Sequence, residues 1–317
     1  MPYRTTIING KRVGRFRASW LLLKETWRFL RLDPEILLIP LIAGLLNILF
    51  FAILVSLGFL LHFTVLPLHS IIDIFENQNF SFYHVLLYIF IFVTYVISAF
   101  TLAFSQGAIA HTVITRLHGE NATLRDSLKV ALHRWRALLT WSIISSTVGI
   151  VLGLIARKSS LIGRLVLSLI GVAWEVLTYF VAPAITIENK SSIDAIKQSG
   201  RTLKQTFGET VMTNIGLSLA LLVFYITAIL VSGVFLFIAF TSGSFILITI
   251  TIIVIFLLFL TLGLLTSALQ GVLKTILYTY VMEHSTPPDF NSDLLQNVII
   301  SDNQSTLHTT DNTRTSI

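Results

Sequence analysis

A single acidic residue lies inside a long apolar stretch of this chain, where its chemistry needs an explanation. Glu175 stands about midway along the apolar run from Ile162 to Ile187. An ionised carboxylate at the centre of a bilayer costs on the order of 3 kcal/mol, so it needs a partner, a proton or water. Gln106 is a depth-matched candidate partner in another apolar run. Two interpretations stay open, a proton or cation site and a neutral glutamic acid that joins helices by hydrogen bonds.

Histidines are the other residues whose types could support chemistry. His111 lies near the charged end of the run that holds Gln106, where an imidazole could titrate near neutral pH, although a hydrogen-bonded interfacial histidine is favoured. His69 and Asp73 are four positions apart, a spacing that places both on one helix face. Two ligands are too few to define a zinc site, so we predict no metal and no cofactor.

The sequence also lacks the motifs of well-known catalytic sites. It contains no cysteine, which excludes disulfides, thiolate metal sites and cysteine nucleophiles. It contains no Gly-x-Ser-x-Gly, no His-Glu-x-x-His, no Walker loop and no dinucleotide-binding glycine pattern. We therefore expect a protein that is not an enzyme.

The composition places the candidate residues in a membrane. Hydrophobic residues make up 54% of the 317 residues and charged residues 12%, and the mean hydropathy is +0.82. Soluble proteins carry about twice that share of charge. The formal net charge is +6 and the pI about 9.7, which cations next to a bilayer explain better than nucleic-acid binding. The fold class predicted is an all-α integral membrane protein.

Gaps in the charge pattern predict about six transmembrane helices. A spanning helix needs roughly 20 apolar residues, and every gap reaches that length. The last gap is long enough for two crossings, with a turn at Thr241–Ser244. The spans are expected within 36–72, 77–115, 137–156, 162–187 and 210–273.

The distribution of Lys and Arg predicts the orientation of these helices. Basic residues cluster before the first span and after the second and fourth spans, so the positive-inside rule places both termini in the cytoplasm of a cell whose inner membrane holds the protein. Arg157, Lys158 and Arg164 disagree, because six spans put them outside. Either that hairpin is shallow, or these side chains snorkel to headgroups, or the rule fails locally.

Three stretches carry the same amphipathic pattern in the same register. Apolar or small residues step by four, three and four positions, which places them on one helix face. A serine occupies the same place in each stretch, at Ser19, Ser127 and Ser199. The three sets are Phe16, Trp20, Leu23 and Trp27; Leu124, Leu128, Ala131 and Trp135; and Ile196, Gly200, Leu203 and Phe207.

The pattern predicts three repeats of a cytoplasmic amphipathic helix followed by a transmembrane hairpin. The units run over about 15–118, 119–188 and 189–283, and together form a membrane domain of residues 15–283. Residues 1–14 are expected to be an N-terminal cytoplasmic tail, and residues 284–317 a largely disordered cytoplasmic tail. Thr123 with Asp126 and Ser191 with Asp194 fit the capping box that begins a helix.

Basic residues occupy the other face of each amphipathic stretch and are the candidates for contact with lipid headgroups. They are Arg17, Lys24, Arg28 and Arg31; Arg125, Lys129 and Arg136; and Lys197, Arg201 and Lys204. Anionic headgroups attract each nearby cation by about 1 kcal/mol. The expected partners are the bilayer and its anionic lipids, with a cytoplasmic protein or a second copy of the chain as further options. These helices could also simply complete the fold.

Small residues recur every four positions on two of the predicted spans. The sets are Ala99, Ala103 and Gly107, and Ser145, Gly149 and Gly153. This spacing lets two helix backbones approach closely, within one bundle or between protomers. Packing within the bundle is the simpler expectation.

Several segments resemble a family of prokaryotic multi-pass membrane proteins catalogued as a domain of unknown function. The segments are FRASWLLLKETWRFLRLDPEILLIP, TLRDSLKVALHRWRALLTWSIISSTVGIVL, AWEVLTYFVAPAITIENKSSIDAIKQSGRTLKQTFGETVMTNIG and LYTYVMEHSTPPDF. The layout is more distantly similar to the membrane domains of some glycerophosphodiester phosphodiesterases, but we expect no room for their soluble catalytic domain. The resemblance implies a membrane location and the fold, and it brings no catalytic residues.

Two functions are consistent with these observations. The first is a non-enzymatic membrane protein that engages anionic lipid, or scaffolds a partner, through its basic interfacial helices. The alternative is a small transporter or lipid-moving protein with Glu175 in an intramembrane polar path.

Overall fold

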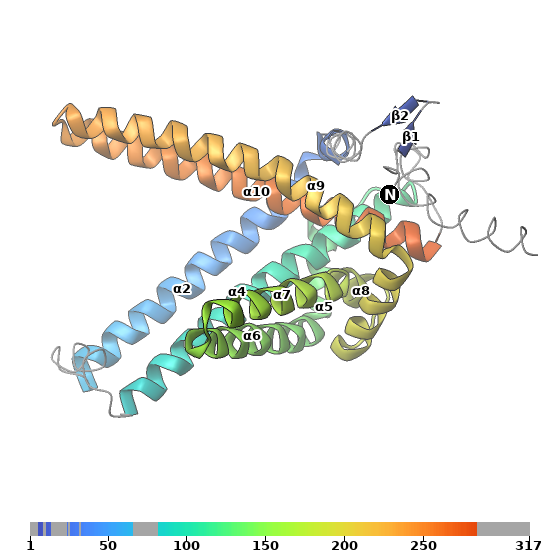
Figure 1. Ribbon diagram of the computed structural model, residues 1–317, viewed down its shortest axis with the longest axis horizontal. Helices are drawn as coiled ribbons and strands as arrows, with labels where there is room; N and C mark the ends of the chain where they lie inside the picture. The colour runs from blue at the N-terminus through green and yellow to red at the C-terminus, as the bar shows by residue number, and fades with distance from the viewer. Residues whose placement is uncertain are drawn as a thin grey trace, which may run out of the picture. The chain divides into compact units, whose positions relative to one another are not determined.

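The computed structural model shows a chain built almost entirely from helices (Figure 1). The structure describes residues 6–8, 11–13, 24, 26–31, 33–65 and 82–283. A short 3-10 helix, η1, precedes the long helices. The elements are β1 (Thr6–Ile8), β2 (Lys11–Val13), η1 (Pro34–Leu37), α2 (Leu38–Val65), α4 (Phe82–Leu117), α5 (Leu124–His133), α6 (Trp135–Lys158), α7 (Leu161–Leu177), α8 (Val181–Ile187), α9 (Ser192–Thr241) and α10 (Phe245–Glu283).

The six predicted spans are confirmed among the described residues. Six helical segments are long and apolar enough to cross a membrane, and α7 with α8 forms one of them. At 1.5 Å per residue, α6 alone is about 36 Å long, more than a hydrocarbon core of about 30 Å. The hairpin that it begins is therefore long enough for a full crossing.

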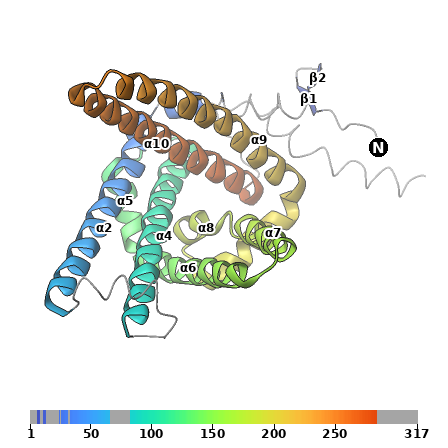
Figure 2. The same ribbon diagram turned by 60° about the vertical axis from the view of Figure 1, so that its left-hand side comes forward.

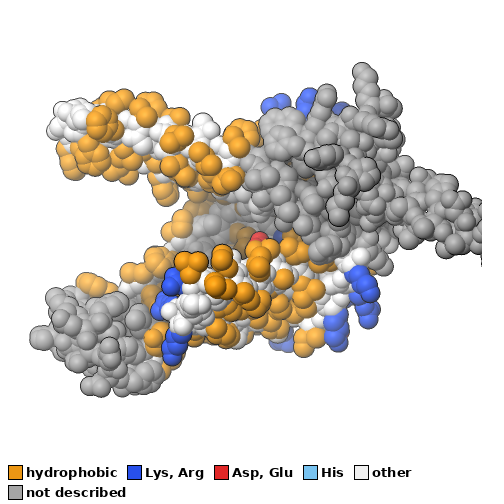
Figure 3. Space-filling view, viewed as in Figure 1, with side chains coloured by type: hydrophobic (Ala, Val, Ile, Leu, Met, Phe, Trp, Pro, Cys, Tyr) orange, Lys and Arg blue, Asp and Glu red, His pale blue; other side chains and the backbone are white. Residues whose placement is uncertain are grey.

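Exposed apolar side chains cover the spans, which is the expected surface for helices whose solvent is lipid. Large hydrophobic residues are exposed along α2, α7, α9 and α10. Figure 3 shows this apolar surface on α9 and α10, and on α6 and α7, where Lys and Arg side chains gather at both ends of the hairpin. Cations at both edges of an apolar band are typical of a helix pair that crosses a bilayer.

The chain divides into two compact units, each made of separate segments. The first unit comprises residues 1–37, 112–122 and 200–317, and the second comprises residues 38–111 and 123–199. These units do not coincide with the three repeats predicted from the sequence, and the repeated layout stays a prediction.

The core of the second unit forms where α4 and α8 approach each other closely. Residues 105–110 of α4 and 181–186 of α8 are buried. A Cβ atom added to Gly107 would lie 2.5 Å from Thr186 Oγ1, so only glycine fits at this contact. The stripe that ends at Gly107 therefore packs within the bundle, as expected, whereas Gly149 and Gly153 on α6 face open space.

A polar contact joins α2 and α4 inside the same unit. Asn47 Nδ2 donates to Thr101 Oγ1 at 2.8 Å, and Thr101 is 6% exposed. The Thr101 hydroxyl in turn donates to backbone carbonyls one turn earlier in α4. Hydrogen bonds of this kind stabilise helix pairs in membranes because lipid offers no competing partner.

The fourth span is broken, which the sequence analysis did not predict. A turn at Thr178–Phe180 separates α7 from α8. Pro183 lies in the first turn of α8, where a missing backbone N–H leaves no helical bond unmade. The break therefore precedes the proline and has another cause, described below.

The first unit contains a long hairpin made by α9 and α10, which lie side by side in both ribbon views (Figures 1 and 2). Its turn falls at the predicted position, where Gly243 adopts a φ of 65°, a conformation that favours glycine. The third amphipathic stretch continues into the fifth span without a break, since α9 runs from Ser192 to Thr241. The interfacial placement expected for this stretch stays a prediction.

The all-α class predicted from the sequence is confirmed, and a short β-hairpin precedes the helices at the N-terminus. β1 and β2 pair antiparallel, with Thr6 opposite Val13 and Ile8 opposite Lys11. Asn9 and Gly10 stand between the strands in sequence, a residue pair typical of hairpin turns. This signal was available within the segment interpreted as a tail. The C-terminal tail predicted for 284–317 lies outside the described residues.

Candidate functional site

The helix α5 has the two faces that the sequence analysis predicted. Ser127 and Ala131 are fully buried, whereas Arg125 and Lys129 are exposed. Its N-terminus is closed by the predicted capping box, because Asp126 N donates to Thr123 Oγ1 at 3.2 Å and the Thr123 hydroxyl donates to the Asp126 carboxylate at 2.5 Å. The helix therefore presents its cations outward from a fixed position.

A basic groove lies where α5 gives way to α6. The helix ends at His133, a single residue, Arg134, forms the junction, and α6 begins at Trp135. The predicted apolar stripe is therefore interrupted before Trp135, whose side chain is 43% exposed. The groove has a volume of about 610 Å³ and is lined by Lys129, Leu132, His133, Trp135 and Arg136. We call this feature the α5–α6 basic groove.

The side chains of the α5–α6 basic groove suit an anionic headgroup. The Arg136 guanidinium lies 5.6 Å from the centre of the Trp135 ring, a cation–π distance that orients both groups. Exposed tryptophan next to arginine is typical of the level at which lipid headgroups meet hydrocarbon. Two cations and an indole can together bind a phosphate and the glycerol region beneath it.

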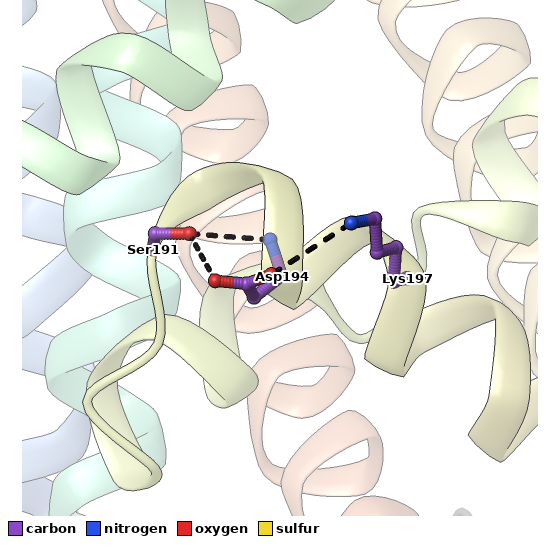
Figure 4. Close-up of polar contacts among 3 residues, drawn as sticks. All are labelled: Ser191, Asp194 and Lys197. Carbon is purple, nitrogen blue, oxygen red and sulfur yellow. Dashed lines mark hydrogen bonds and ion pairs between the residues drawn. The ribbon is translucent and has the colours of Figure 1, made fainter.

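The start of α9 repeats the arrangement of the α5 start. Asp194 N donates to Ser191 Oγ at 3.3 Å, and the Ser191 hydroxyl donates to the Asp194 carboxylate at 2.6 Å (Figure 4). Lys197 Nζ lies 4.0 Å from Asp194 Oδ1, with both side chains more than half exposed, so this ion pair is weak. Further along α9, Arg201 and Lys204 are also exposed.

The first amphipathic stretch is only partly described. Lys24, Arg28 and Arg31 are exposed, and Thr26 and Leu30 between them are buried. The Arg31 guanidinium lies 5.3 Å from the centre of the Trp27 ring. Arg17 lies outside the described residues, as do the other residues in the N-terminal half of that stretch. Every headgroup candidate that the structure describes is therefore exposed.

Two of the three serines that the pattern singled out have clear structural roles. Ser127 Oγ lies 3.3 Å from His111 Nδ1 and so joins α5 to α4. Ser199 Oγ donates to Leu177 O at 2.6 Å and accepts from Phe180 N at 3.0 Å. Both serines fasten an amphipathic stretch to the end of the preceding span. Ser19 is outside the described residues.

The Ser199 contacts explain the break between α7 and α8. A helix leaves its last carbonyls and the first amides of the next helix without internal partners. The Ser199 hydroxyl bonds to one group of each kind and is itself fully buried. The residues that stabilise this break are far from it in sequence, which is why the sequence predicted one continuous span.

The intramembrane polar candidates do not share one environment. Gln106 is 6% exposed in the core of the second unit, whereas Glu175 is exposed on α7 two residues before that helix ends. His111 is half-buried and contacts Ser127, which agrees with the hydrogen-bonded histidine favoured from the sequence. Trp174, beside Glu175, stacks on Trp141 of α6 at 6.1 Å between ring centres.

One buried ion pair was not predicted. Asp33, just before η1, is 5% exposed, and Arg116 near the end of α4 binds it through Nε at 2.9 Å and a terminal nitrogen at 2.8 Å. Arg116 was interpreted only as a cation that orients the second span. The two residues are 83 positions apart, so no local signal could reveal the pair.

Metal ligands do not gather in the part of the chain that the structure describes. There, no group of three or more His, Cys, Asp or Glu side chains could hold an ion. His69 and Asp73, the pair weighed as metal ligands, lie outside the described residues.

The fold and the exposed basic surfaces define a class, a multi-pass α-helical membrane protein with amphipathic segments next to its spans. The chain belongs to a family of unknown function, DUF6159, whose model matches residues 85–287, well over half of the sequence. This confirms the resemblance to an uncharacterised multi-pass membrane family. No curated protein matches the chain.

Proposed function

We propose that this protein is a non-enzymatic protein of a prokaryotic inner membrane that engages anionic lipid through its basic interfacial surfaces. The observation that carries the proposal is the α5–α6 basic groove, where Lys129 and Arg136 flank an exposed tryptophan. The buried Ser127 and Ala131 hold α5 by its other face, so Lys129 faces outward, and Arg136 at the start of α6 is exposed as well.

The expected ligand is an acidic phospholipid of the adjacent leaflet. Each Lys or Arg close to an anionic surface contributes about 1 kcal/mol. Two such residues in one groove correspond to roughly a 30-fold preference for acidic over zwitterionic headgroups. A cytoplasmic protein with an acidic surface would use the same cations and is the competing partner.

The test uses the full-length protein purified in native membrane particles. Mass spectrometry of the intact particles counts the acidic phospholipids that stay bound. We expect the double variant Lys129→Gln with Arg136→Gln to lose most of the acidic lipid that the unmodified protein retains.

A matched control exists at the other end of α6. The double variant Arg157→Gln with Lys158→Gln removes the same charge from exposed positions outside the α5–α6 basic groove. Lipid retention should change little in this control. If both double variants retain the same acidic lipid as the unmodified chain, the proposal is wrong.

The cytoplasmic orientation is part of the proposal and has its own test. The chain has no cysteine, so single cysteines can be introduced without removing any. Glu120→Cys before α5 should react with an impermeant thiol reagent only from the inside, and Ser242→Cys at the α9–α10 turn only from the outside. The opposite result would place the basic groove against the outer leaflet.

A further inference from the structure

A second groove, with mainly apolar walls, lies on the α9–α10 hairpin of the first unit. It has a volume of about 540 Å³, within the range of small-molecule sites. Its walls are apolar side chains of the two helices, namely Leu221, Phe224, Leu262, Leu265 and Leu269. We call it the α9–α10 groove.

The walls of this groove offer no free polar group to an occupant. The two hydroxyls that line it, those of Tyr225 and Thr266, lie 3.3 Å apart and bond to each other. The Tyr225 ring also packs against Phe259, with ring centres 6.5 Å apart, which holds the hydroxyl toward α10. The interior therefore suits a hydrocarbon chain.

One end of the groove carries a cation and an indole. Lys24 and Trp27 line it from the first amphipathic stretch, where Lys24 is exposed and Trp27 is half-buried. Lys24 is therefore the cation that lines this end of the groove. Lysine beside tryptophan at the edge of a transmembrane hairpin is typical of the headgroup level.

The position of the groove along the helices agrees with this level. Leu221 lies 22 positions before Gly243 at the turn, about 33 Å along the helix, and Leu269 lies shortly before Lys274 on α10. The groove therefore starts where the spans enter the hydrocarbon and extends inward. An occupant must come from the bilayer, since its walls belong to transmembrane helices.

We propose that the α9–α10 groove binds one acidic phospholipid, with an acyl chain along the Leu262–Leu265 wall and its phosphate beside Lys24. Charge selects the lipid, because the cation at the groove's end complements an acidic headgroup. A symmetric second copy of the chain would bring the same cations to that end and is not complementary. The inference rests on the proposed engagement of anionic lipid and adds a separate site to it.

The test compares three full-length variants in bilayer particles that contain a mixture of phosphatidylglycerol and phosphatidylcholine. Leu265→Trp fills the groove, Lys24→Gln removes its cation, and Val254→Trp places the same indole on an exposed face of α10 outside the groove. Mass spectrometry of the intact particles counts the retained lipids of each kind.

We expect Leu265→Trp to lose one retained lipid, and Val254→Trp to lose none. The Lys24→Gln variant should still retain a lipid in the groove. Its preference for phosphatidylglycerol over phosphatidylcholine should fall about fivefold, the effect of removing one cation near a phosphate. Because Lys24 is exposed, this variant keeps the test decisive even where Leu265→Trp fails to fold.

Failure here is distinguishable from failure of the proposed function. If Leu265→Trp and Lys24→Gln retain lipid as the unmodified chain does, while the Lys129 and Arg136 variant loses it, the α9–α10 groove is not a lipid site and the proposed function stands. If Lys24→Gln changes the retention of both lipids equally, the groove binds hydrocarbon without selecting for headgroup charge, and the proposal is overturned.

Discussion

The helices of the second unit and the α9–α10 hairpin both present apolar surfaces to lipid, yet their helices associate differently. In the second unit, Gly107 allows α4 to approach α8, and Asn47 bonds across to Thr101. In the hairpin, the Tyr225–Thr266 contact stands among apolar side chains, and a groove remains between the helices.

This difference follows from the solvent. Lipid tails are as apolar as leucine, so leucine-rich faces gain little by leaving lipid, and close packing and hydrogen bonds must hold transmembrane helices together. The second unit has both. In the hairpin, the Tyr225–Thr266 hydrogen bond is long, and the α9–α10 groove remains beside it. Helix association in the second unit should therefore be sensitive to single substitutions, and in the hairpin much less so.

The largest effect is expected at Gly107. Gly107→Ala places a methyl group against Thr186, so α4 and α8 must separate, and we expect the free energy of unfolding to fall by about 2 kcal/mol. Thermal unfolding in detergent, followed by circular dichroism, measures the change. Gly149→Ala is the control, because nothing lies within 4 Å of its added Cβ. Equal effects at the two positions would mean that the α4–α8 contact does not exist.

A comparable loss is expected at Ser199. Ser199→Ala leaves the Phe180 amide and the Leu177 carbonyl without their partner in a buried place, at a cost of about 1–3 kcal/mol. Hydrogen exchange should rise at the α7–α8 break. By comparison, Ser191→Ala removes only an exposed cap, worth about 1 kcal/mol, and should leave exchange at the break unchanged.

The polar contacts of the two regions can be compared directly. Asn47→Leu should cost about 1 kcal/mol, because it removes a short hydrogen bond between α2 and α4. Tyr225→Phe should cost less than about 0.5 kcal/mol, since its 3.3 Å contact is long. A larger loss at Tyr225 than at Asn47 would reverse the comparison and show that hydrogen bonding holds the hairpin.

The smallest effect is expected at Glu175. The side chain is exposed, so Glu175→Gln should change the free energy of unfolding by no more than about 0.5 kcal/mol. Proton and cation uptake into vesicles, measured on the same protein, tests the transport alternative. Uptake by the unmodified chain that the glutamine variant abolishes would favour transport over lipid engagement.

Much of the architecture followed from local patterns. The six spans, the turn before Phe245 and both capping boxes are visible as gaps in charge, small polar residues and hydroxyl–carboxylate pairs at fixed spacing. Exposure of the cations on α5 also followed, because a helix with one apolar face must turn its other face outward. These features depend on residues within a few turns of one another.

The candidate sites were harder to predict from the sequence. The basic residues of the α5–α6 groove were predicted, but Trp135 was assigned to the apolar face of the same helix, since periodicity does not reveal that α5 stops at His133. The α9–α10 groove joins Lys24 to side chains almost 200 positions later, for example Leu221. No spacing rule predicts such a pairing.

The amino-acid sequence alone determined that this protein resides in a membrane, how many times it crosses, and which helix faces are charged, because hydropathy and helical period are local properties. Only the tertiary structure decided where the fourth span breaks, which serine holds that break, and where grooves remain between helices. Those features depend on contacts between distant segments, and in lipid such contacts are selected by shape and hydrogen bonding instead of by hydrophobicity.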